Sequence, residues 1–377
     1  MTQNIFQKLY HKDLEKAYAN FDGIILDNKI DDLEDVQSYF ENLRSKSKSN
    51  TKILVSYHNH FWEPILTLAS KLGLRKKVGV QNWLDQRDVE NLLNLSEFEV
   101  VSTTKRFFGL TVITIAKTRK QIKESKHKEY SVSVVVPARN EEGNIAKVTP
   151  NIPKFGKWQE FIFVEGNSTD KTWSAINNFQ FSIFKQGSSS KNPNFKRTIK
   201  AFRQKGKGKA DAVKLGFEKA SGDILMIYDA DRTVNGNDLE KFYRVLSSGI
   251  GRFANGSRMV YPMEKDAMRT LNKIGNKIFG LLFSSILGTR FKDTLCGTKA
   301  MWRRDFVKFK KDYKSYLKTD PFGDFALIFT AIKHKMKVVE IPVRYKERVY
   351  GSTNINRFRH GLLLCKMTLL AFIEFKL

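Results

Sequence analysis

The sequence is poor in cysteine, with only Cys296 and Cys365 among 377 residues. Two cysteines are too few for a disulfide framework, which fits the reducing environment of a cytoplasm. The first ten residues contain neither an apolar run nor a small-residue cleavage site, so we expect no secretory signal. No stretch reaches the roughly 20 apolar residues that a membrane-spanning helix needs. The nearest candidate, Gly361 to Leu377, is interrupted by three charged residues.

Acidic side chains are scarce relative to basic ones, with 39 Asp and Glu against 66 Lys and Arg, a net charge of +27. Residues 1–130 hold 21 basic and 17 acidic side chains, a net of +4, whereas residues 131–377 hold 45 and 22, a net of +23. A basic surface of this size attracts phosphate-bearing substrates, anionic lipid headgroups or nucleic acid. The plainer interpretation is a solubilising surface. Apolar residues make up 41% of the chain, which is enough for a packed core.

A charged stretch from Lys117 to Glu129 separates two regions of apolar patterning. It lacks the alternation of a strand and is typical of an interdomain connection. We therefore predict an α/β region over residues 1–116, a linker over residues 117–130 and a second α/β region over residues 131–377.

Strand and helix patterns alternate before the linker. Runs rich in β-branched and aromatic residues predict strands at Phe21–Leu26, Thr51–Tyr57, Phe98–Thr103 and Leu110–Ile115. Helical spacing predicts helices at Leu33–Leu43, Trp62–Leu72 and Asp85–Leu95. Asp31 and Asp32 are candidate caps for the first of these helices.

Two segments of this region, FDGIILDNKIDDLEDVQ and QNWLDQRDVENLLNLSEFEVV, resemble the second half of a class I S-adenosylmethionine-dependent methyltransferase. The first half is missing, and with it the glycine-rich turn that would hold the cofactor. We therefore expect residues 1–116 to be a non-catalytic, partial methyltransferase-like region that binds no S-adenosylmethionine. His58 and His60 have the spacing of a metal pair, but no third ligand is evident, so we interpret them as surface or core residues.

Three apolar runs after the linker predict strands buried on both faces of a parallel sheet, at Val132–Val136, Phe161–Val164 and Ile224–Tyr228. Polar residues follow each run directly. They are Pro137 to Glu142, Glu165 to Asp170, and Asp229-Ala230-Asp231. Ligands bind at the carboxyl edge of open α/β sheets, so we expect a site where these three segments meet.

Asp229 and Asp231 are the predicted metal ligands. Two carboxylates two positions apart can reach one divalent cation at a strand end, because the chain has left the regular pleat there. Mg²⁺ and Mn²⁺ prefer carboxylate and phosphate oxygens, so the same cation would neutralise a leaving nucleoside diphosphate. Most such triplets are ordinary turns, and the position after a buried strand is what favours a site here.

A basic loop, Gly206-Lys207-Gly208-Lys209, precedes a predicted helix that begins near Ala210. Backbone N–H groups and two ammonium groups could hold a phosphate at that helix start. The loop matches neither the Walker sequence nor the dinucleotide fingerprint. Its alternative interpretation is a flexible basic loop.

From Ser131 to Lys376 the chain resembles the family 2 glycosyltransferases. The resemblance rests on motifs in a fixed order: VVVPARNEEGNI, VEGNSTDKT, GKGKADAVKLGF with GDILMIYDAD, NGSR, DTLCGTKAMWRRDF and ERVYGSTNINRFRHG. Within the family, the chain is most similar to dolichyl- or polyprenyl-phosphate sugar synthases and to bacterial proteins that fuse a methyltransferase-like domain to such a transferase. The resemblance implies a nucleotide-binding single-sheet fold of the GT-A type, a UDP- or GDP-linked sugar donor and inverting transfer.

The resemblance also implies roles for individual residues. Those on the nucleotide-sugar side are Pro137, Ala138, Asn140, Glu141, Glu165, Asn167, Lys207, Lys209 and Asp229. Glu165 stands where the family usually has an Asp facing the base, so the resemblance does not decide whether the base of the donor is uracil or guanine. Asp231 matches the position that binds the metal.

On the acceptor side, Arg258, Arg348 and Ser352 match positions that face an acceptor phosphate. Guanidinium groups suit this task because they bind phosphate oxygens bidentately. Asn354 departs from the pattern, since these relatives often carry Lys there.

Asp324 matches the acidic position of the family on the acceptor side. It would act as general base if the acceptor is a hydroxyl, and would only organise the site if the acceptor is a phosphate. The alternative is an N-cap for a helix over Phe325–Ile332. Cys296 has no evident base nearby and is expected to pack.

Leu271–Leu287 and Gly361–Phe375 have helical apolar spacing with basic residues nearby. They predict either amphipathic helices in the headgroup layer or ordinary core helices. Together with the charge, they favour peripheral attachment at the inner face of the membrane and a lipid phosphate as acceptor. The rivals are a saccharide hydroxyl acceptor, a basic nucleic-acid-binding protein and an inactive scaffold. No nucleic-acid module is recognised, and the intact motifs argue against a scaffold.

Overall fold

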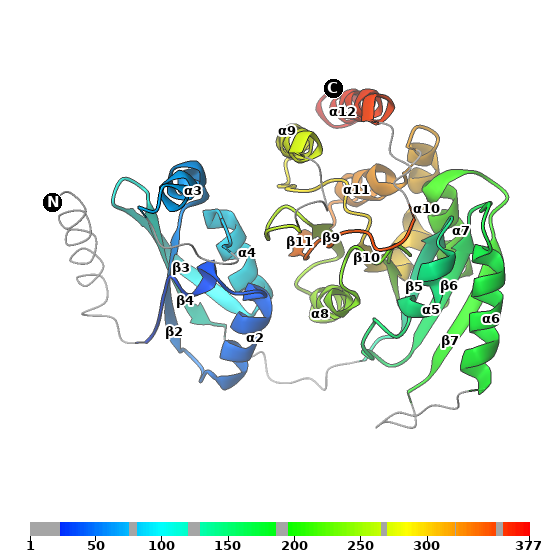
Figure 1. The fold of residues 1–377 in the computed structure, drawn as a ribbon, viewed down its shortest axis with the longest axis horizontal. Coiled ribbons are helices and arrows are strands. Elements are labelled where there is room, and N and C mark those ends of the chain that lie inside the picture. Colours follow the sequence, from blue (N-terminus) through cyan, green and yellow to red (C-terminus); the bar gives the residue numbers. More distant parts are fainter. Residues whose placement is uncertain are drawn as a thin grey trace. The chain divides into compact units, whose positions relative to one another are not determined.

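The computed structural model describes residues 23–74, 81–119, 129–185, 195–264, 270–320, 322–351 and 357–377. The chain forms two compact units, shown in Figure 1. The first comprises Met1–Ser125 with Val260–Pro262, and the second comprises Lys126–Met259 with Met263–Leu377. The second unit is therefore not the continuous stretch 131–377 that the sequence predicted, because Val260 and Tyr261 are buried in the apolar core of the first.

The first unit is built on a sheet of strands in the order β1-β2-β4-β3. Their bounds are β1 Ile24–Asp27, β2 Lys52–His58, β3 Phe98–Arg106 and β4 Thr111–Thr118. β1 and β2 are parallel, and β4 runs antiparallel to both β2 and β3. The helices are η1 Lys29–Asp31, α2 Val36–Lys46, η2 His60–Trp62, α3 Glu63–Lys71 and α4 Gln86–Leu95.

Two predicted boundaries in this unit are wrong. Lys117 and Thr118 belong to β4, where they pair with Lys52 and Phe98, so the linker does not begin at residue 117. Backbone pairing holds these residues in a strand although their side chains lack an apolar pattern. The cap of α2 is Asp35, whose carboxylate accepts a hydrogen bond from the backbone N–H of Ser38 at 3.0 Å, rather than Asp31 or Asp32.

The second unit is built on a sheet in the order β11-β9-β10-β8-β5-β6-β7. The bounds are β5 Val132–Ala138, β6 Gln159–Glu165, β7 Arg197–Arg203, β8 Ile224–Ile227, β9 Phe253–Ser257, β10 Lys299–Trp302 and β11 Val338–Pro342. β10 is antiparallel to its two neighbours, and the other pairs are parallel. The carboxyl ends of β5, β6 and β8 therefore lie at one edge, as the three apolar runs predicted.

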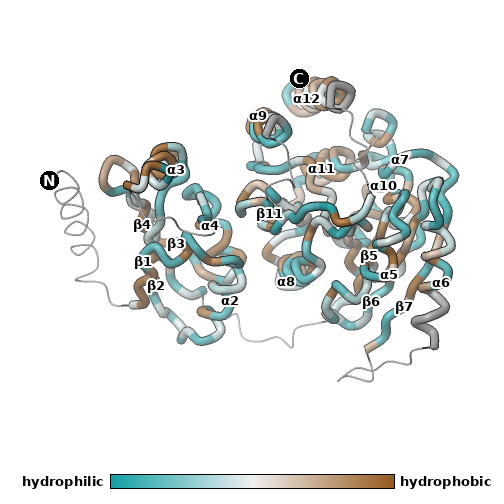
Figure 2. Tube along the Cα trace, viewed as in Figure 1, coloured by the Kyte–Doolittle hydropathy of each residue, from teal (hydrophilic) through white to brown (hydrophobic). Residues whose placement is uncertain are grey.

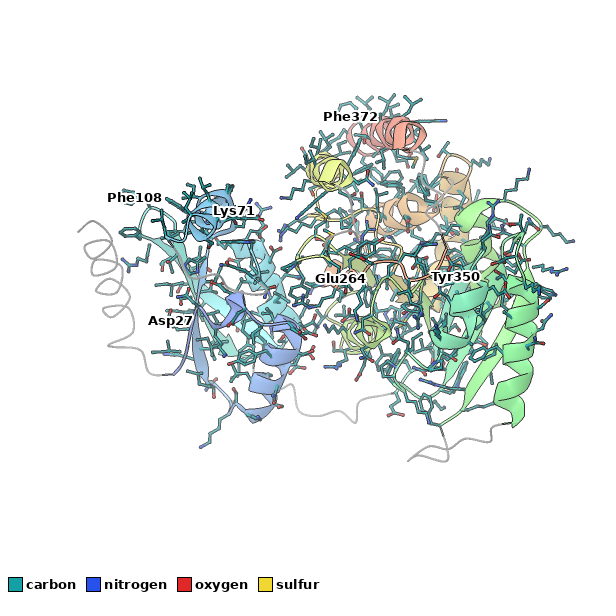
Figure 3. All side chains as sticks on the ribbon, in the orientation of Figure 1. Asp27, Lys71, Phe108, Glu264, Tyr350 and Phe372 are labelled. Carbon is teal, nitrogen blue, oxygen red and sulfur yellow. The ribbon has the colours of Figure 1, made fainter. Side chains whose placement is uncertain are left out.

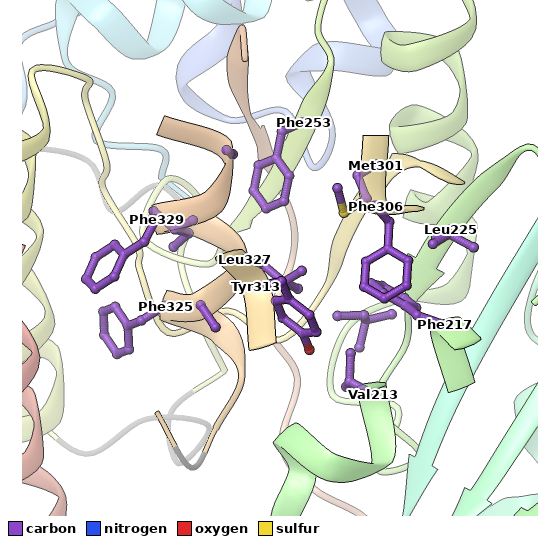
Figure 4. Packing of buried hydrophobic residues seen from close by; sticks show 14 of the residues in the cluster. Val213, Phe217, Leu225, Phe253, Met301, Phe306, Tyr313, Phe325, Leu327 and Phe329 are labelled. Carbon is purple, nitrogen blue, oxygen red and sulfur yellow. The ribbon is translucent and has the colours of Figure 1, made fainter. Parts of the chain in front are cut away.

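The helices of this unit are α5 Glu142–Val148, α6 Thr172–Lys185, α7 Gly208–Lys219, η3 Gly236–Asp238, α8 Leu239–Ser247, α9 Thr270–Leu287, α10 Arg303–Leu317, α11 Asp324–Lys333 and α12 Arg357–Lys376. α11 is nearly all buried and packs among aromatic side chains (Figure 4). The Phe325 ring stacks on Phe283 with 4.9 Å between centroids, and Phe306 meets Tyr313 edge-on at 5.5 Å. This apolar cluster fixes the start of α11, where Asp324 lies.

α9 and α12 each have two apolar faces. Phe283 and Leu287 of α9, and Met367 and Ala371 of α12, are buried in the core. Other apolar side chains of both helices are exposed, and Figure 2 shows brown, hydrophobic segments on each. Both helices contribute to the core, as the core-helix alternative predicted, and their contact with a headgroup layer stays a prediction. Within the described residues, no helix has the length and apolar character to cross a membrane.

Candidate active site

The polar segments after β5 and β6 are tied to each other by hydrogen bonds. The Asn140 backbone N–H donates to Ser168 Oγ at 3.1 Å, and the Thr169 N–H donates to Asn140 Oδ1 at 2.8 Å. Asn167 extends the network to the basic loop, because its amide donates to the Gly206 carbonyl at 3.3 Å. Asn140 and Asn167 both have left-handed backbones, with φ of 58° and 57°, which Asn tolerates better than most residues. The three segments that were predicted to contact the nucleotide are thus joined by hydrogen bonds at one edge of the sheet.

Glu165 is buried at the end of β6 and is engaged within its own turn. One carboxylate oxygen accepts from the Ser168 N–H at 2.5 Å, and the other lies 3.7 Å from Arg203 Nε. Its predicted contact with a nucleotide base is not tested by this arrangement. What the structure establishes is that Glu165 holds the turn that carries Asn167.

Asp229 is paired with a lysine of the basic loop region. Lys209 Nζ lies 2.5 Å from Asp229 Oδ1. Burial disfavours the charge of Lys209, but Asp229, Asp324 and Asp231 outweigh it and raise the pKa of its ammonium group. The pair leaves no room for a side chain at Gly297, where a Cβ would approach Lys209 Nζ to 2.1 Å and Asp229 Oδ2 to 2.2 Å. Lys209 lies in the first turn of α7 and is ion-paired, so it belongs to a helix and not to a loop.

The rest of the basic loop is also ordered around α7. Lys207 occupies the N-cap position of α7. Ala138, which was also predicted on the nucleotide side, is buried at the end of β5. The Gly206 N–H donates to Asp211 Oδ2 at 3.0 Å, so this N–H of the proposed phosphate cradle already has an acceptor in the protein.

Asp231 is bridged to Glu141 by one guanidinium group. Arg348 Nη2 lies 2.7 Å from Asp231 Oδ2, and Arg348 Nη1 lies 3.0 Å from Glu141 Oε1. The second oxygen of Asp231 accepts from the Thr233 N–H at 3.1 Å. Burial raises the pKa of the Glu141 carboxyl, with Arg348 opposing this and Asp231 adding to it. The residue predicted to face the acceptor thus directly contacts the residue predicted to hold the metal.

The segment that carries Arg348 is seated on the first turn of α5. A Cβ on Gly143 would lie 2.7 Å from the ring of Tyr350, so only glycine allows this ring to approach. Gly351 has a φ of 77°, and a Cβ added to it would lie 3.4 Å from the Asn140 carbonyl oxygen. Ser352 and Asn354 lie outside the described residues.

Arg258 has a different environment from Arg348. It is almost buried, and its Nε and Nη2 atoms lie 2.6 Å and 2.9 Å from the two carboxylate oxygens of Asp293. Burial opposes charge on Asp293, but Arg258 and the hydrogen bonds around it lower the pKa of the carboxyl. Arg258 also lies over the Tyr345 ring, 5.0 Å from its centroid. In this structure Arg258 fixes the loop before β10, and its predicted contact with an acceptor phosphate stays a prediction.

Asp324 begins α11 and forms a buried ion pair, with its Oδ1 atom 3.1 Å from Lys299 Nζ. The N-cap alternative for Asp324 is wrong, because the cap position is Gly323 and the carboxylate of Asp320 accepts from the N–H of Ala326 at 2.9 Å. Cys296 is buried, as predicted, and burial raises the pKa of its thiol to about 11. Lys299 Nζ also donates to the Cys296 carbonyl.

Asp229 and Asp231 fit a divalent cation by the chemistry of their oxygens. Within the described residues, no group of three or more His, Cys, Asp or Glu side chains could enclose a metal. The two carboxylates would therefore supply part of a coordination shell, and phosphate oxygens of a bound nucleotide would supply more.

In the first unit, His58 Nδ1 contacts Asp31 Oδ2 at 2.5 Å and thus has a structural partner.

Several residues that hold this site together were not predicted from the sequence. Asp293, Gly297 and Lys299 all lie in the DTLCGTK segment, which supported the family resemblance without a role for its members. This segment holds a glycine, an acidic residue and a basic residue within seven positions, and that composition is the feature from which a structural role could have been predicted. Their partners, Arg258, Asp229 and Asp324, lie far away along the chain and could not be read from local spacing.

Residues 133–333 match the model of a family described as glycosyl transferase family 2. A dolichol-phosphate mannosyltransferase of Pyrococcus furiosus is 27% identical over 228 residues, which is 59% of this chain and 59% of that protein. A glycosyltransferase of Haloferax volcanii is 26% identical over 234 residues, 61% of this chain and 68% of its own. A UDP-N-acetylglucosamine–dolichyl-phosphate N-acetylglucosaminyltransferase of Methanococcus voltae is 24% identical over 247 residues, 63% of this chain and 96% of its own.

A solved structure of glucosyl-3-phosphoglycerate synthase from Mycobacterium tuberculosis, in complex with Mn²⁺, uridine diphosphate and glucosyl-3-phosphoglycerate, is also similar. It aligns with a TM-score of 0.43 and 18% identity over 67% of this chain and 85% of that one. The family match confirms the predicted GT-A-type fold and the predicted enzyme class. Since it spans more than half of the chain, this protein belongs to glycosyl transferase family 2.

Proposed function

We propose that the protein transfers a sugar from a nucleotide-sugar donor to a polyprenyl or dolichyl phosphate at the inner surface of a membrane. The transfer inverts the anomeric configuration, by direct displacement of the nucleoside diphosphate. The observation that carries the proposal is the contact of Arg348 with Asp231 and Glu141. It brings the guanidinium group assigned to the acceptor phosphate next to the carboxylate assigned to the donor metal.

The donor side supplies stabilisation of the leaving group. Asp229 and Asp231 would hold a divalent cation, which neutralises the charge that develops on the departing diphosphate. Lys209 lies within the same cluster, and its ammonium group is kept charged by its acidic neighbours. A fixed cation in a partly buried site stabilises a developing anion without having to reorganise.

The acceptor side supplies orientation. A lipid phosphate oxygen is already an anion, so it can attack the anomeric carbon without a base. Arg348 can release its carboxylate partners and bind the phosphate bidentately, since a guanidinium group presents parallel N–H donors. Asp324 is paired with buried Lys299, which favours an organising role over proton transfer.

The membrane part of the proposal rests on α9 and α12. Leu281 on α9 is 74% exposed and Leu362 on α12 is 75% exposed. Between the helices lies a groove of about 520 Å³, lined by apolar residues that include Phe279, Leu369 and Phe372. Lys273, Lys277 and Lys366 are exposed on the same helices. Apolar side chains with lysines nearby suit the boundary between lipid headgroups and acyl chains. The relatives that act on dolichyl phosphates, by their names, support a membrane-borne acceptor.

The test of the acceptor assignment is Arg348→Ala. We expect transfer to polyprenyl phosphate to fall at least about 100-fold, while binding of the nucleotide sugar, measured by calorimetry, changes little. Arg244→Ala is the matched control, because Arg244 is an exposed arginine on α8 paired with Glu240. Its transfer rate should equal that of the unmodified protein.

An acceptor competition decides between lipid phosphate and hydroxyl. Polyprenyl phosphate and a soluble oligosaccharide are offered together with a panel of UDP- and GDP-sugars. Efficient glycosylation of the oligosaccharide without transfer to polyprenyl phosphate would overturn the proposal and assign Asp324 as general base.

A further inference from the structure

The first unit exposes large apolar side chains on helix α3. In Figure 2, α3 is largely brown, and none of its residues is buried. Ile65, Leu68 and Leu72 follow each other at intervals of three and four along this segment, and all are more than half exposed. Residues at this spacing lie on one face of a helix. Phe61, just before α3, is 73% exposed. Solvated helices in water-soluble domains normally place polar residues on such a face.

A hairpin tip brings further aromatic side chains to the same end of the unit. Phe107 and Phe108 form the turn between β3 and β4, and Phe108 is 93% exposed. The Asn59 N–H donates to the Leu110 carbonyl at 2.9 Å, which ties the segment leading into α3 to this turn. In Figure 3, Phe108 and Lys71 lie at the same end of the unit, away from Asp27.

The turn presents Phe108 outward at a conformational cost. Phe107 and Phe108 have φ angles of 48° and 52°, in the left-handed region that aromatic residues rarely adopt. Backbone strain of this kind tends to be found where a side chain is presented for function. The two rings also contact each other edge-on, with 5.8 Å between centroids.

Positive charge borders the apolar face. Lys105 and Arg106 precede the two phenylalanines directly, and Lys71 ends α3; all three are exposed. Residues 100–110 contain no acidic side chain. Long basic side chains beside apolar ones can reach lipid phosphates while their neighbours enter the acyl region.

We propose that this surface, made of Phe61, Ile65, Leu68, Leu72 and Phe108 with Lys71, Lys105 and Arg106, docks the first unit on an anionic lipid bilayer. A protruding, nearly fully exposed phenylalanine suits a deformable headgroup layer, which needs no preformed pocket to receive it. The bordering cations complement anionic headgroups. The first unit would thus add a membrane contact of its own to that proposed for α9 and α12.

A fluorophore at the hairpin tip tests this contact in the full chain. The chain has only two cysteines, of which Cys296 is buried and Cys365 is exposed, so Cys365→Ala leaves no exposed thiol. In that background, Phe108→Cys carries an environment-sensitive label. Val101→Cys is the matched control, because Val101, within β3 and away from the hairpin tip, is likewise an exposed apolar residue.

We expect vesicles of equal parts phosphatidylglycerol and phosphatidylcholine to shift the emission at position 108 to the blue, and to leave position 101 unchanged. The native Cys365, labelled in the otherwise unmodified chain, reports on α12 in the same assay. A shift at Cys365 without one at position 108 would overturn the inference and leave the membrane contact of α12 standing. A shift at position 108 that grows with protein concentration and needs no vesicles would also overturn it, and would assign the surface to contact between two copies of the chain.

Charge removal provides a second measurement. Lys105→Ala and Arg106→Ala should each weaken binding to the same vesicles about fivefold, since each basic residue near an anionic surface contributes a comparable attraction. Thermal unfolding of both variants should match that of the unmodified protein, because these side chains are exposed. If both variants bind the vesicles as tightly as the unmodified protein does, the electrostatic part of the inference is contradicted.

Discussion

At the carboxyl edge of the first sheet, Asp27 accepts a hydrogen bond from Ser56 Oγ at 2.6 Å, and Asp31 contacts His58. Ser56 and His58 both belong to the neighbouring strand β2. At the carboxyl edge of the second sheet, Asp229 and Asp231 meet Lys209 and Arg348, which come from α7 and from the segment after β11. Both edges carry acidic residues, and at the second edge these residues meet cations from distant parts of their unit.

The difference shows what turns a polar sheet edge into a candidate active site. Carboxylates that are hydrogen-bonded to the neighbouring strand stabilise local structure, and we do not expect them to exchange that partner for a ligand. Acids that face cations from other elements form a charge cluster that a phosphate or a metal can enter by exchanging one ionic partner for another. The predictions below test whether the two edges really differ in this way.

The largest effect is expected for Asp231→Asn. The amide cannot replace the carboxylate as metal ligand or as partner of Arg348, so we expect the rate of sugar transfer to fall at least about 100-fold while the fold is retained. Asp27→Asn, at the edge of the first sheet, is the control and should leave transfer unchanged. Full activity of Asp231→Asn, or undiminished turnover in a chelator, would remove the metal from the mechanism.

A large loss of stability is expected for Asp293→Ala. The variant leaves the guanidinium group of Arg258 buried without its carboxylate, which should lower the free energy of unfolding by about 3–5 kcal/mol. Chemical denaturation measures this change. Glu240→Ala, which breaks the exposed pair with Arg244, should change stability by no more than about 0.5 kcal/mol. Similar losses in the two variants would mean that burial does not distinguish these ion pairs.

A smaller, pH-dependent effect is expected from Glu340 in β11. Burial raises the pKa of its carboxyl from 4.5 to about 7, although the backbone N–H groups of Lys292 and Asp293 oppose this by donating to it. A raised pKa in the folded state means that the stabilisation is complete below about pH 4.5 and is lost as pH rises through about 7. The free energy of unfolding should fall by up to about 3 kcal/mol across this window.

Glu340→Gln should remove most of that decline, and denaturation at several pH values measures it. Part of the slope should remain, because burial also raises the pKa of Asp320 to about 6. A decline of unchanged size in Glu340→Gln would show that other groups cause it.

The smallest expected effect concerns the first unit. Calorimetry of the full chain with S-adenosylmethionine should give no binding heat, since the glycine-rich turn that would hold the cofactor is missing from the sequence. A dissociation constant in the micromolar range would mean that the edge of the first sheet is itself a working site, and would undo the comparison between the two edges.

Much of the fold of the second unit could be predicted from the sequence. Val132–Val136, Phe161–Val164 and Ile224–Tyr228 are continuous apolar runs, and each became a buried parallel strand. β7, with the sequence RTIKAFR, lies at the edge of the sheet and was not predicted because it has neither a continuous apolar run nor strict alternation. The short strands β9 and β10 were not predicted either, since four or five residues carry too little pattern.

The sequence by itself determined which residues stand at the ends of the buried strands, because the apolar runs end directly before the segments that carry Asp229, Asp231 and Glu141. Only the tertiary structure decided which charges meet there. Arg258 and Arg348 look alike as arginines beside polar motifs, yet one is locked to buried Asp293 and the other bridges Asp231 and Glu141. The strength of an ion pair depends on the distance in space between the two charged side chains. When the two residues are far apart in the chain, that distance cannot be predicted from the local sequence around either of them.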